Sequence, residues 1–305
     1  MKRLTGLLLL ILVCTWTAFA TEGKLPKANK GVASLIFFYF GDSKYETLGQ
    51  ETTRLKLAME DYEYRVLLKH DVVSPFWDLS EKDEKLANEK GLPTKENLIK
   101  YLKKLADDGY MIDLWIFSHG SRDGFRASLG THGSKGSFTI SDIQGLTGVG
   151  GTTGYKILPL RLVYQTNCYG SYLHQSWLNA GAKCAIGSRY VNFYPTQFGG
   201  FAKKWNKGKT VAEALEDADT AASRTLAQTY ILSLAKKTND DWGGCPFPST
   251  VLGDHACAKK YFLFAWLADS EWQNNKSGKE NMNYSSDMLI KGDRSLTKHK
   301  KPTWK

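Results

Sequence analysis

Two apolar runs that each lead into a chemically reactive side chain constrain this chain most. Residues 112–117 are apolar apart from one aspartate, and His119 and Gly120 follow after a single serine. Residues 162–164 form a second apolar run, and Cys168 follows it after three polar residues. Short apolar runs bounded by polar residues and glycine predict buried strands of a parallel sheet. The carboxyl ends of parallel strands meet at one sheet edge, so we expect His119 and Cys168 to lie together there.

The rest of the chain alternates between predicted strands and predicted helices. Helical spacing of apolar residues begins near Leu48, and a second helix opens at Thr94. The other expected helices begin near Tyr172 and at Thr210, the latter reaching about Lys236. Further strands are expected at 32–40, 64–68, 184–188 and 261–266. This alternation predicts an α/β fold with a mostly parallel sheet flanked by helices. The stretch 121–154 is rich in Gly, Ser and Thr and predicts a mobile loop across the site, with a short helix from Ser141.

The amino terminus has the features of a secretory signal peptide. Lys2 and Arg3 precede an apolar stretch over 7–13, and small residues end at Ala20. We expect cleavage after Ala20 and a secreted or periplasmic protein. No later segment has the ~20 apolar residues that a membrane-spanning helix needs, so no transmembrane segment is expected.

The net charge is basic, and part of the surplus is near the carboxyl terminus. Removal of residues 1–20 lowers the formal charge from +10 by two, to +8. Lys298, Lys300, Lys301 and Lys305 crowd the tail. We interpret residues 291–305 as a solvated, loose end without nucleic-acid binding, because no aromatic and basic platform accompanies the lysines. Weak contact with an anionic surface through this tail is a further expectation.

Four cysteines remain after signal removal, an even number that suits an oxidising compartment. Cys245 and Cys257 lie close together in a loop rich in Gly and Pro and are candidates for a disulfide. Cys184 lies within an apolar run and is expected to be a buried filler. Cys168 is then the reactive candidate, and a structural Cys168–Cys184 bridge is the alternative.

A cysteine and a histidine are suited to nucleophilic catalysis at a carbonyl. The thiolate attacks, and a nearby imidazole stabilises it or carries protons. The resulting oxyanion needs backbone N–H donors, for which we name Gly120 and Cys168. The histidines at 70, 132, 174, 255 and 299 are expected to be surface or loop residues. None has metal-ligand spacing, so neither a metal nor another cofactor is expected.

These motifs resemble the caspase-like (clan CD) cysteine peptidases, which include caspases, metacaspases, legumains, clostripain, gingipains and CHAT proteases. His119 and Cys168 are 49 positions apart, each after an apolar strand. The run from His119 to Gly124 is similar to the legumain-type His-Gly turn. Pro93-Thr94 resembles a metacaspase helix start, and Gly253-Asp254 resembles a late motif of gingipain and CHAT domains.

The resemblance implies a caspase-like three-layer sandwich over residues 32–269, after a leader at 21–31 and before a polar basic tail at 270–305. It also implies an endopeptidase with His119 as base and Cys168 as nucleophile, acting on a protein or peptide. The family's substrate lies along the strand before Tyr190. We therefore name as substrate-binding candidates Asp123, Ser188, Arg189 and Tyr190.

Two questions stay open at the level of sequence. Asp123, Asp142 or Asp254 in the pocket would favour basic substrates, whereas Arg122, Arg126 or Arg189 would favour acidic or Asn-like ones. The chain departs from the family by having Asn167 before the cysteine and Tyr169-Gly170 after it. The alternative function is a catalytically inactive caspase-fold binding or scaffold protein at the cell surface or in the periplasm.

Overall fold

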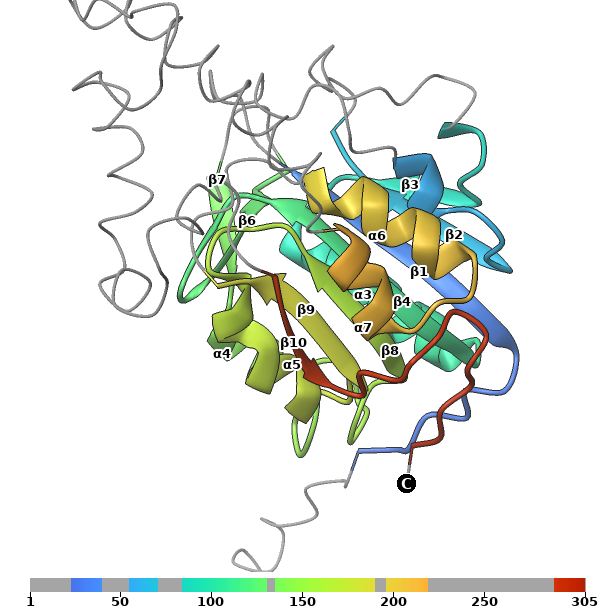
Figure 1. The fold of residues 1–305 in the computed structure, drawn as a ribbon. Coiled ribbons are helices and arrows are strands. Elements are labelled where there is room, and N and C mark those ends of the chain that lie inside the picture. The colour runs from blue at the N-terminus through green and yellow to red at the C-terminus, as the bar shows by residue number, and fades with distance from the viewer. Residues whose placement is uncertain are drawn as a thin grey trace, which may run out of the picture.

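A seven-stranded sheet forms the centre of the described part of the chain (Figure 1). The computed structural model describes residues 23–39, 55–70, 84–130, 135–189, 196–218 and 288–304. The strand order is β10-β9-β8-β4-β1-β2-β3. The strands are β1 (Gly31–Tyr39), β2 (Tyr64–Leu68), β3 (Glu89–Gly91), β4 (Tyr110–Ser118), β8 (Leu160–Gln165), β9 (Cys184–Ser188) and β10 (Met288–Gly292). All neighbours are parallel except β10, which runs antiparallel to β9.

Side chains of the central strands alternate between two apolar layers. In β1, Leu35 and Phe37 enter one core cluster, while Ile36 and Phe38 enter the other. The first cluster is covered by α3 (Lys95–Asp107) and α5 (His174–Asn179). The second is covered by α6 (Thr196–Asn206), α7 (Val211–Ala218) and the short 3₁₀ helix η2 (Leu55–Ala58). The predicted α/β architecture, with helices on both faces of a mostly parallel sheet, is confirmed (Figure 1).

Helix α3 begins where its sequence predicts. The Thr94 hydroxyl accepts a hydrogen bond from the backbone N–H of Asn97 at 3.1 Å, which satisfies a donor at the helix start. Leu98, Leu102 and Leu105 are all fully buried on one side of the helix. Gly109 has a φ of +84° immediately before β4, a backbone conformation that favours glycine.

The expectation of a mobile loop over 121–154 is wrong. This region contains a small antiparallel sheet of β5 (Gly120–Ser121), β6 (Gly124–Ser128) and β7 (Lys135–Thr139), followed by α4 (Ile140–Gln144). Phe125 and Phe138 are buried, and their rings stack with centroids 5.2 Å apart. Phe125 also packs against Phe37, and Phe138 against Trp177. Phe125 and Phe138 therefore anchor a β-hairpin in the core. The many Gly, Ser and Thr residues around them led to the wrong prediction of a loop.

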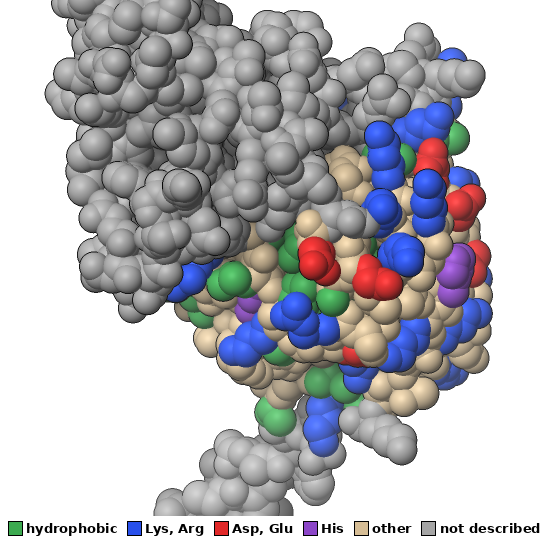
Figure 2. All heavy atoms as spheres, in the orientation of Figure 1, with side chains coloured by type: hydrophobic (Ala, Val, Ile, Leu, Met, Phe, Trp, Pro, Cys, Tyr) green, Lys and Arg blue, Asp and Glu red, His purple; other side chains and the backbone are tan. Residues whose placement is uncertain are grey.

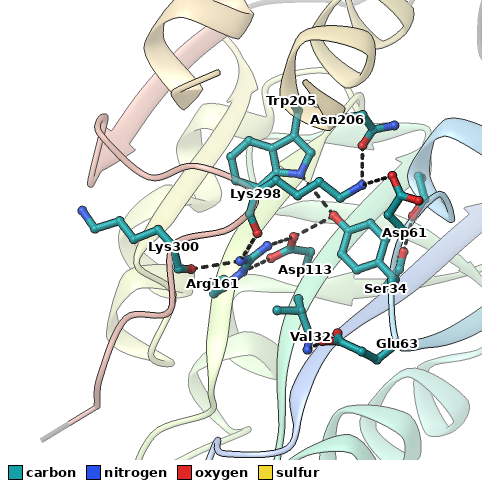
Figure 3. Close-up of polar contacts among 12 residues, drawn as sticks. Val32, Ser34, Asp61, Glu63, Asp113, Arg161, Trp205, Asn206, Lys298 and Lys300 are labelled. Carbon is teal, nitrogen blue, oxygen red and sulfur yellow. Dashed lines mark hydrogen bonds and ion pairs between the residues drawn. The ribbon is translucent and has the colours of Figure 1, made fainter. Parts of the chain in front are cut away.

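A buried ion pair links β4 to β8 beneath the second helical layer (Figure 3). Arg161 and Asp113 are both fully buried, and two N–H groups of the guanidinium donate to the carboxylate at 2.9 and 2.5 Å. The Tyr62 hydroxyl donates to the same carboxylate at 2.7 Å. Arg161 also donates to the main-chain carbonyls of Lys298 and Lys300. Every charge in this network is paired or hydrogen-bonded, as burial requires.

The carboxyl-terminal segment is not the loose, solvated end that its composition predicts. Strand β10 pairs with β9, and the following residues fold back over the sheet (Figure 1). Leu296 is fully buried, and the Trp304 indole N–H donates to the carbonyl of Gly181 at 2.8 Å. The Lys298 ammonium is itself buried and donates to Glu60 O and Asn206 Oδ1. Burial of a few apolar residues against distant segments therefore orders this part of the chain, although its high charge favours a solvated end.

Several sequence predictions lie outside the described residues. They are the signal peptide, Tyr190, His132, His255, the Gly253-Asp254 motif, the Cys245–Cys257 disulfide, the 261–266 strand, the first part of the helix near Leu48, and the helix at Thr210 beyond Ala218. Within the described ranges, no helix is both long enough and apolar enough to cross a bilayer. On the face seen in Figure 2, lysine and arginine side chains are interspersed with acidic ones.

Candidate active site

The parallel pairing of β4 with β8 brings the two predicted reactive residues to one end of the sheet. Ile116 and Gln165 are partners in the register, and His119 and Cys168 each lie three residues beyond that pair. The backbone N–H of Thr166 donates to the carbonyl of Ile116 at 2.9 Å, so the two chains remain joined past the last strand residue. His119 and Cys168 are both half-buried. The predicted common edge is therefore present.

Gly120 and Asn167 provide a direct contact between the two segments. A Cβ placed on Gly120 would lie 2.7 Å from Asn167 Nδ2 and 2.8 Å from Asn167 Cβ. Only a glycine allows the residue after His119 to approach the residue before Cys168 this closely. Asn167 is fully buried, its Nδ2 donates to the carbonyl of Cys168 at 3.3 Å, and its Oδ1 has no hydrogen-bond partner within the described ranges.

The turn after Cys168 has an unusual backbone. Tyr169 adopts the left-handed conformation, with φ 57° and ψ 23°, and the 3₁₀ helix η3 (Gly170–Leu173) follows it. A non-glycine residue in this region carries strain, which persists only where the surroundings enforce it. Gln165 supplies part of that enforcement, because its side-chain amide nitrogen, Nε2, donates to the carbonyl of Gly170 at 3.2 Å. The Trp177 indole N–H in turn donates to Gln165 Oε1 at 3.0 Å.

The backbone on the histidine side is also fixed. The carbonyl of His119 accepts from the N–H of Arg126 at 2.9 Å, across the β5–β6 hairpin. The Ser118 hydroxyl donates to the carbonyl of Arg126 at 2.8 Å. These bonds hold the residues around His119 to β6, which is anchored in turn by buried Phe125. The position of the histidine backbone thus depends on the hairpin that the sequence did not reveal.

A cation and two aromatic rings connect the hairpin to the cysteine turn. The Arg122 guanidinium carbon lies 5.3 Å from the ring centroid of Tyr169 and 5.1 Å from that of Tyr172. The two tyrosine rings meet edge to face, with centroids 6.1 Å apart. Arg122 and Tyr172 are exposed, so this cluster forms part of the surface beside Cys168. Cation–π contacts of this kind are favourable at about 0.5–1 kcal/mol in exposed positions.

The remaining predicted substrate-binding residues have different surroundings. Asp123 lies exposed at the tip of the β5–β6 hairpin. Ser188 is buried at the end of β9, and its hydroxyl donates to the carbonyl of Asn167 at 2.6 Å, which commits it to supporting the cysteine turn. Arg189 follows β9 and is half-buried. Asp142 is paired with Lys95 and caps α4, so its carboxylate is already engaged.

The alternative of a Cys168–Cys184 bridge is excluded by the sheet register. Cys184 pairs with Leu162 near the start of β8, whereas Cys168 follows the end of the same strand. Neither cysteine forms a disulfide. Cys184 is fully buried, and burial raises the pKa of its thiol to about 12. It is a buried filler, as predicted, and it is unsuited to act as a nucleophile.

The expectation that His174 is a surface or loop residue is wrong. His174 begins α5 and is only 3% exposed. Burial, together with the positive charge of Lys291, lowers the pKa of its imidazole to about 4. The ring bonds to the main chain of Ile186, while Nε2 has no hydrogen-bond partner among the residues described here. It is a neutral core side chain under the cysteine turn.

A thiol and an imidazole at the same sheet edge are the groups required for nucleophilic catalysis. The described ranges contain no cluster of three His, Cys, Asp or Glu residues that could hold a metal ion. Sequence reasoning missed Gln165 as a brace of the turn and Arg122 as its lateral contact. The sequence did contain a signal for Gln165, because a polar residue at the end of a buried strand needs a hydrogen-bond partner nearby. No local signal indicated that Arg122 would reach Tyr169.

No protein-family model matches this chain, and no curated protein matches it either.

Proposed function

We propose that the protein is an exported cysteine endopeptidase of the caspase-like type, with His119 and Cys168 as its catalytic dyad. The observation that carries the proposal is the register of β4 and β8, in which both residues lie three positions beyond the Ile116–Gln165 pair. The mostly parallel sheet with helices on both faces is compatible with that fold type. Strained backbone at Tyr169, directly after the proposed nucleophile, also supports a functional site.

The proposed reaction proceeds through an acyl-thioenzyme. His119 accepts the proton of the Cys168 thiol, and the sulfur attacks the carbonyl carbon of the scissile peptide bond. The tetrahedral intermediate collapses as the carbon–nitrogen bond breaks, and the imidazolium of His119 protonates the departing amine. Water then attacks the thioester carbonyl, with His119 accepting its proton. The carboxylic acid product leaves, and Cys168 recovers its thiol.

The oxyanion of each tetrahedral intermediate needs donors that are in place beforehand. We assign this role to the backbone N–H groups of Gly120 and Cys168. The close contact of Gly120 with Asn167 supports the assignment, because it fixes the two backbone segments relative to each other before substrate arrives. Ser188 adds to this fixation through its bond to the carbonyl of Asn167.

The test compares two cysteines that differ in burial. The purified chain is incubated with a peptide library, and new amino termini are detected by mass spectrometry. Cys168→Ala and His119→Ala should each abolish cleavage, while Cys184→Ala should retain it because Cys184 lies at the other end of the sheet. Brief treatment with iodoacetamide should modify Cys168 and inactivate the protein, leaving Cys184 unmodified. Undiminished turnover in a folded Cys168→Ala variant would refute the proposal.

A further inference from the structure

Arg122 lies against two tyrosine rings, and its guanidinium N–H groups have no hydrogen-bond acceptor within the described ranges. Its carbon lies over the rings of both Tyr169 and Tyr172. No ion pair or hydrogen bond joins its side chain to any carboxylate in the described ranges, including that of its neighbour Asp123. The residue is exposed. A cation held in one orientation without an anion is therefore present on the surface of this site.

The chemistry of arginine indicates what such a group would bind. The guanidinium is planar, carries five N–H donors in a rigid fork, and matches a carboxylate through two parallel hydrogen bonds. A cation–π contact does not use an acceptor of a ligand, so a guanidinium held against aromatic rings can still donate N–H groups to an anion. Because the two tyrosines restrict its rotamers, less side-chain entropy is lost when an anion binds.

The location ties this group to the proposed reaction. Tyr169 is the residue directly after Cys168, and Arg122 lies three residues after His119 on the β5–β6 hairpin. The cluster therefore lies between the two segments that supply the proposed nucleophile and base. A polypeptide whose carbonyl carbon reaches Cys168 would bring its neighbouring side chains within range of Arg122.

We propose that Arg122, held by Tyr169 and Tyr172, forms a carboxylate-binding subsite next to Cys168. The subsite selects polypeptides that carry an acidic group close to the residue whose carbonyl carbon reaches Cys168. This inference rests on the proposed function for its meaning in catalysis, although binding at the subsite does not need a reactive thiol. Of the side chains that could set this preference, Asp142 is engaged by Lys95, whereas Arg122 contacts the tyrosines and has no anionic partner among the residues described here; we therefore infer the acidic preference.

The first experiment measures binding, so that it does not depend on turnover. Fluorescent peptides with both termini blocked, in which one Asp is scanned along the sequence, are titrated onto the Cys168→Ala variant. The matched peptides carry Asn at the same positions. We expect the best Asp peptide to bind about threefold to fivefold more tightly than its Asn counterpart, the upper range for an exposed ion pair. The preference should weaken as salt rises.

Substitutions of two arginines on the same hairpin show whether the preference for Asp peptides comes from Arg122 itself or from the overall positive charge of the protein. Arg122→Gln should remove the preference for Asp, and Arg122→Lys, which keeps the charge but loses the fork, should retain only part of it. Arg126→Gln is the matched control, because Arg126 is also exposed and lies on β6, whereas the cation–π contacts of the two tyrosines within the described ranges are with Arg122. Thermal unfolding of each variant checks that the fold is intact.

The binding preferences of the Arg122 and Arg126 variants support or overturn the proposed subsite. Loss of the Asp preference in Arg122→Gln but not in Arg126→Gln supports it. Equal binding of Asp and Asn peptides, or an equal loss in both variants, overturns it. A second arm uses peptides with a free carboxyl terminus and no acidic side chain. Tight binding of these peptides that depends on Arg122 would support the subsite and identify a chain-end carboxylate as its ligand.

Turnover measurements distinguish this inference from the proposed function. In the unmodified protein, kcat/KM should favour the same Asp peptides, and Arg122→Glu should shift the preference toward Lys at that position. Cleavage without any acidic preference would overturn the subsite and leave the peptidase proposal intact. Binding that depends on Arg122 without cleavage would retain the subsite and refute the peptidase proposal.

Discussion

The main chain of Gly120 lies beside the side chain of Asn167, with no room between them for a Cβ, although the two residues belong to segments that are distant in sequence. The Cα of Gly120 approaches so closely that an added Cβ would lie 2.7 Å from Asn167 Nδ2. This contact joins the residue after His119 to the residue before Cys168. The relative position of the proposed base and nucleophile therefore depends on the absence of one side chain.

Gly120→Ala should impair catalysis more than folding. The new methyl group must displace buried Asn167 or move the His119 backbone, and a displacement near 1 Å can lower turnover about 100-fold. We expect a loss of that size in kcat/KM, with the unfolding free energy reduced by about 1–3 kcal/mol. Gly145→Ala is the control, since its φ is −74° and its nearest contact would be 3.2 Å. Equal effects of the two changes on turnover would contradict the assigned role of Gly120.

The left-handed backbone at Tyr169 predicts an unusual order of stability. Tyr169→Ala removes the ring but retains a side chain at φ 57°, whereas Tyr169→Gly removes both the ring and the strain. Glycine should therefore be more stable than alanine by about 1 kcal/mol, the reverse of the order in a helix. Chemical denaturation of the two variants measures the difference. An alanine variant as stable as the glycine variant would show that the residue is not left-handed in solution.

Breaking the buried ion pair should be costly. Asp113→Ala leaves Arg161 buried without its carboxylate, and loss of one partner from such a pair typically destabilises by about 3–5 kcal/mol. Asp108→Ala removes a partner of exposed Lys104 and should cost less than about 1 kcal/mol. Urea denaturation of both variants tests the contrast. Similar losses in the two would mean that the Asp113–Arg161 pair is accessible to water.

Point changes in the carboxyl-terminal segment test whether it is part of the fold. Leu296 is fully buried, so Leu296→Ala should reduce the unfolding free energy by about 2–5 kcal/mol. Lys301→Ala, at an exposed position five residues later, should have an effect within about 0.5 kcal/mol. Calorimetry or denaturant titration gives both values. A solvated tail would instead leave stability unchanged in both variants.

His174 should make the protein sensitive to acid. Burial and the charge of Lys291 lower the pKa of its imidazole from 6.5 to about 4, so the unfolded chain binds a proton over a range where the native protein does not. Stability attributable to this residue is present above pH 6.5 and is lost as the pH falls toward 4, by roughly 3 kcal/mol in all. His174→Gln cannot titrate, so its unfolding free energy should fall less steeply over this interval. Parallel pH profiles for the two proteins would contradict the lowered pKa.

The sequence alone predicted those parts of the fold whose signal is local. Continuous apolar runs defined β1, β2, β4 and β8, because strands buried on both faces need apolar side chains at every position. The capping residue Thr94 and leucines at helical spacing defined α3. Because the carboxyl ends of parallel strands lie at the same end of a sheet, the sequence also predicted that His119 and Cys168 share that end.

Only the tertiary structure decided the features that depend on partners far away in sequence. The hairpin after His119 is held by Phe125 and Phe138, whose burial comes from Phe37 and Trp177. The basic tail is ordered because its carbonyls satisfy buried Arg161.

The same distinction holds within the candidate site. The types of the two reactive residues and the shared strand edge follow from local pattern, but the contact of Gly120 with Asn167 and that of Arg122 with Tyr169 do not. Local periodicity records whether a side chain is buried, whereas its partner is selected by packing between segments that the sequence separates.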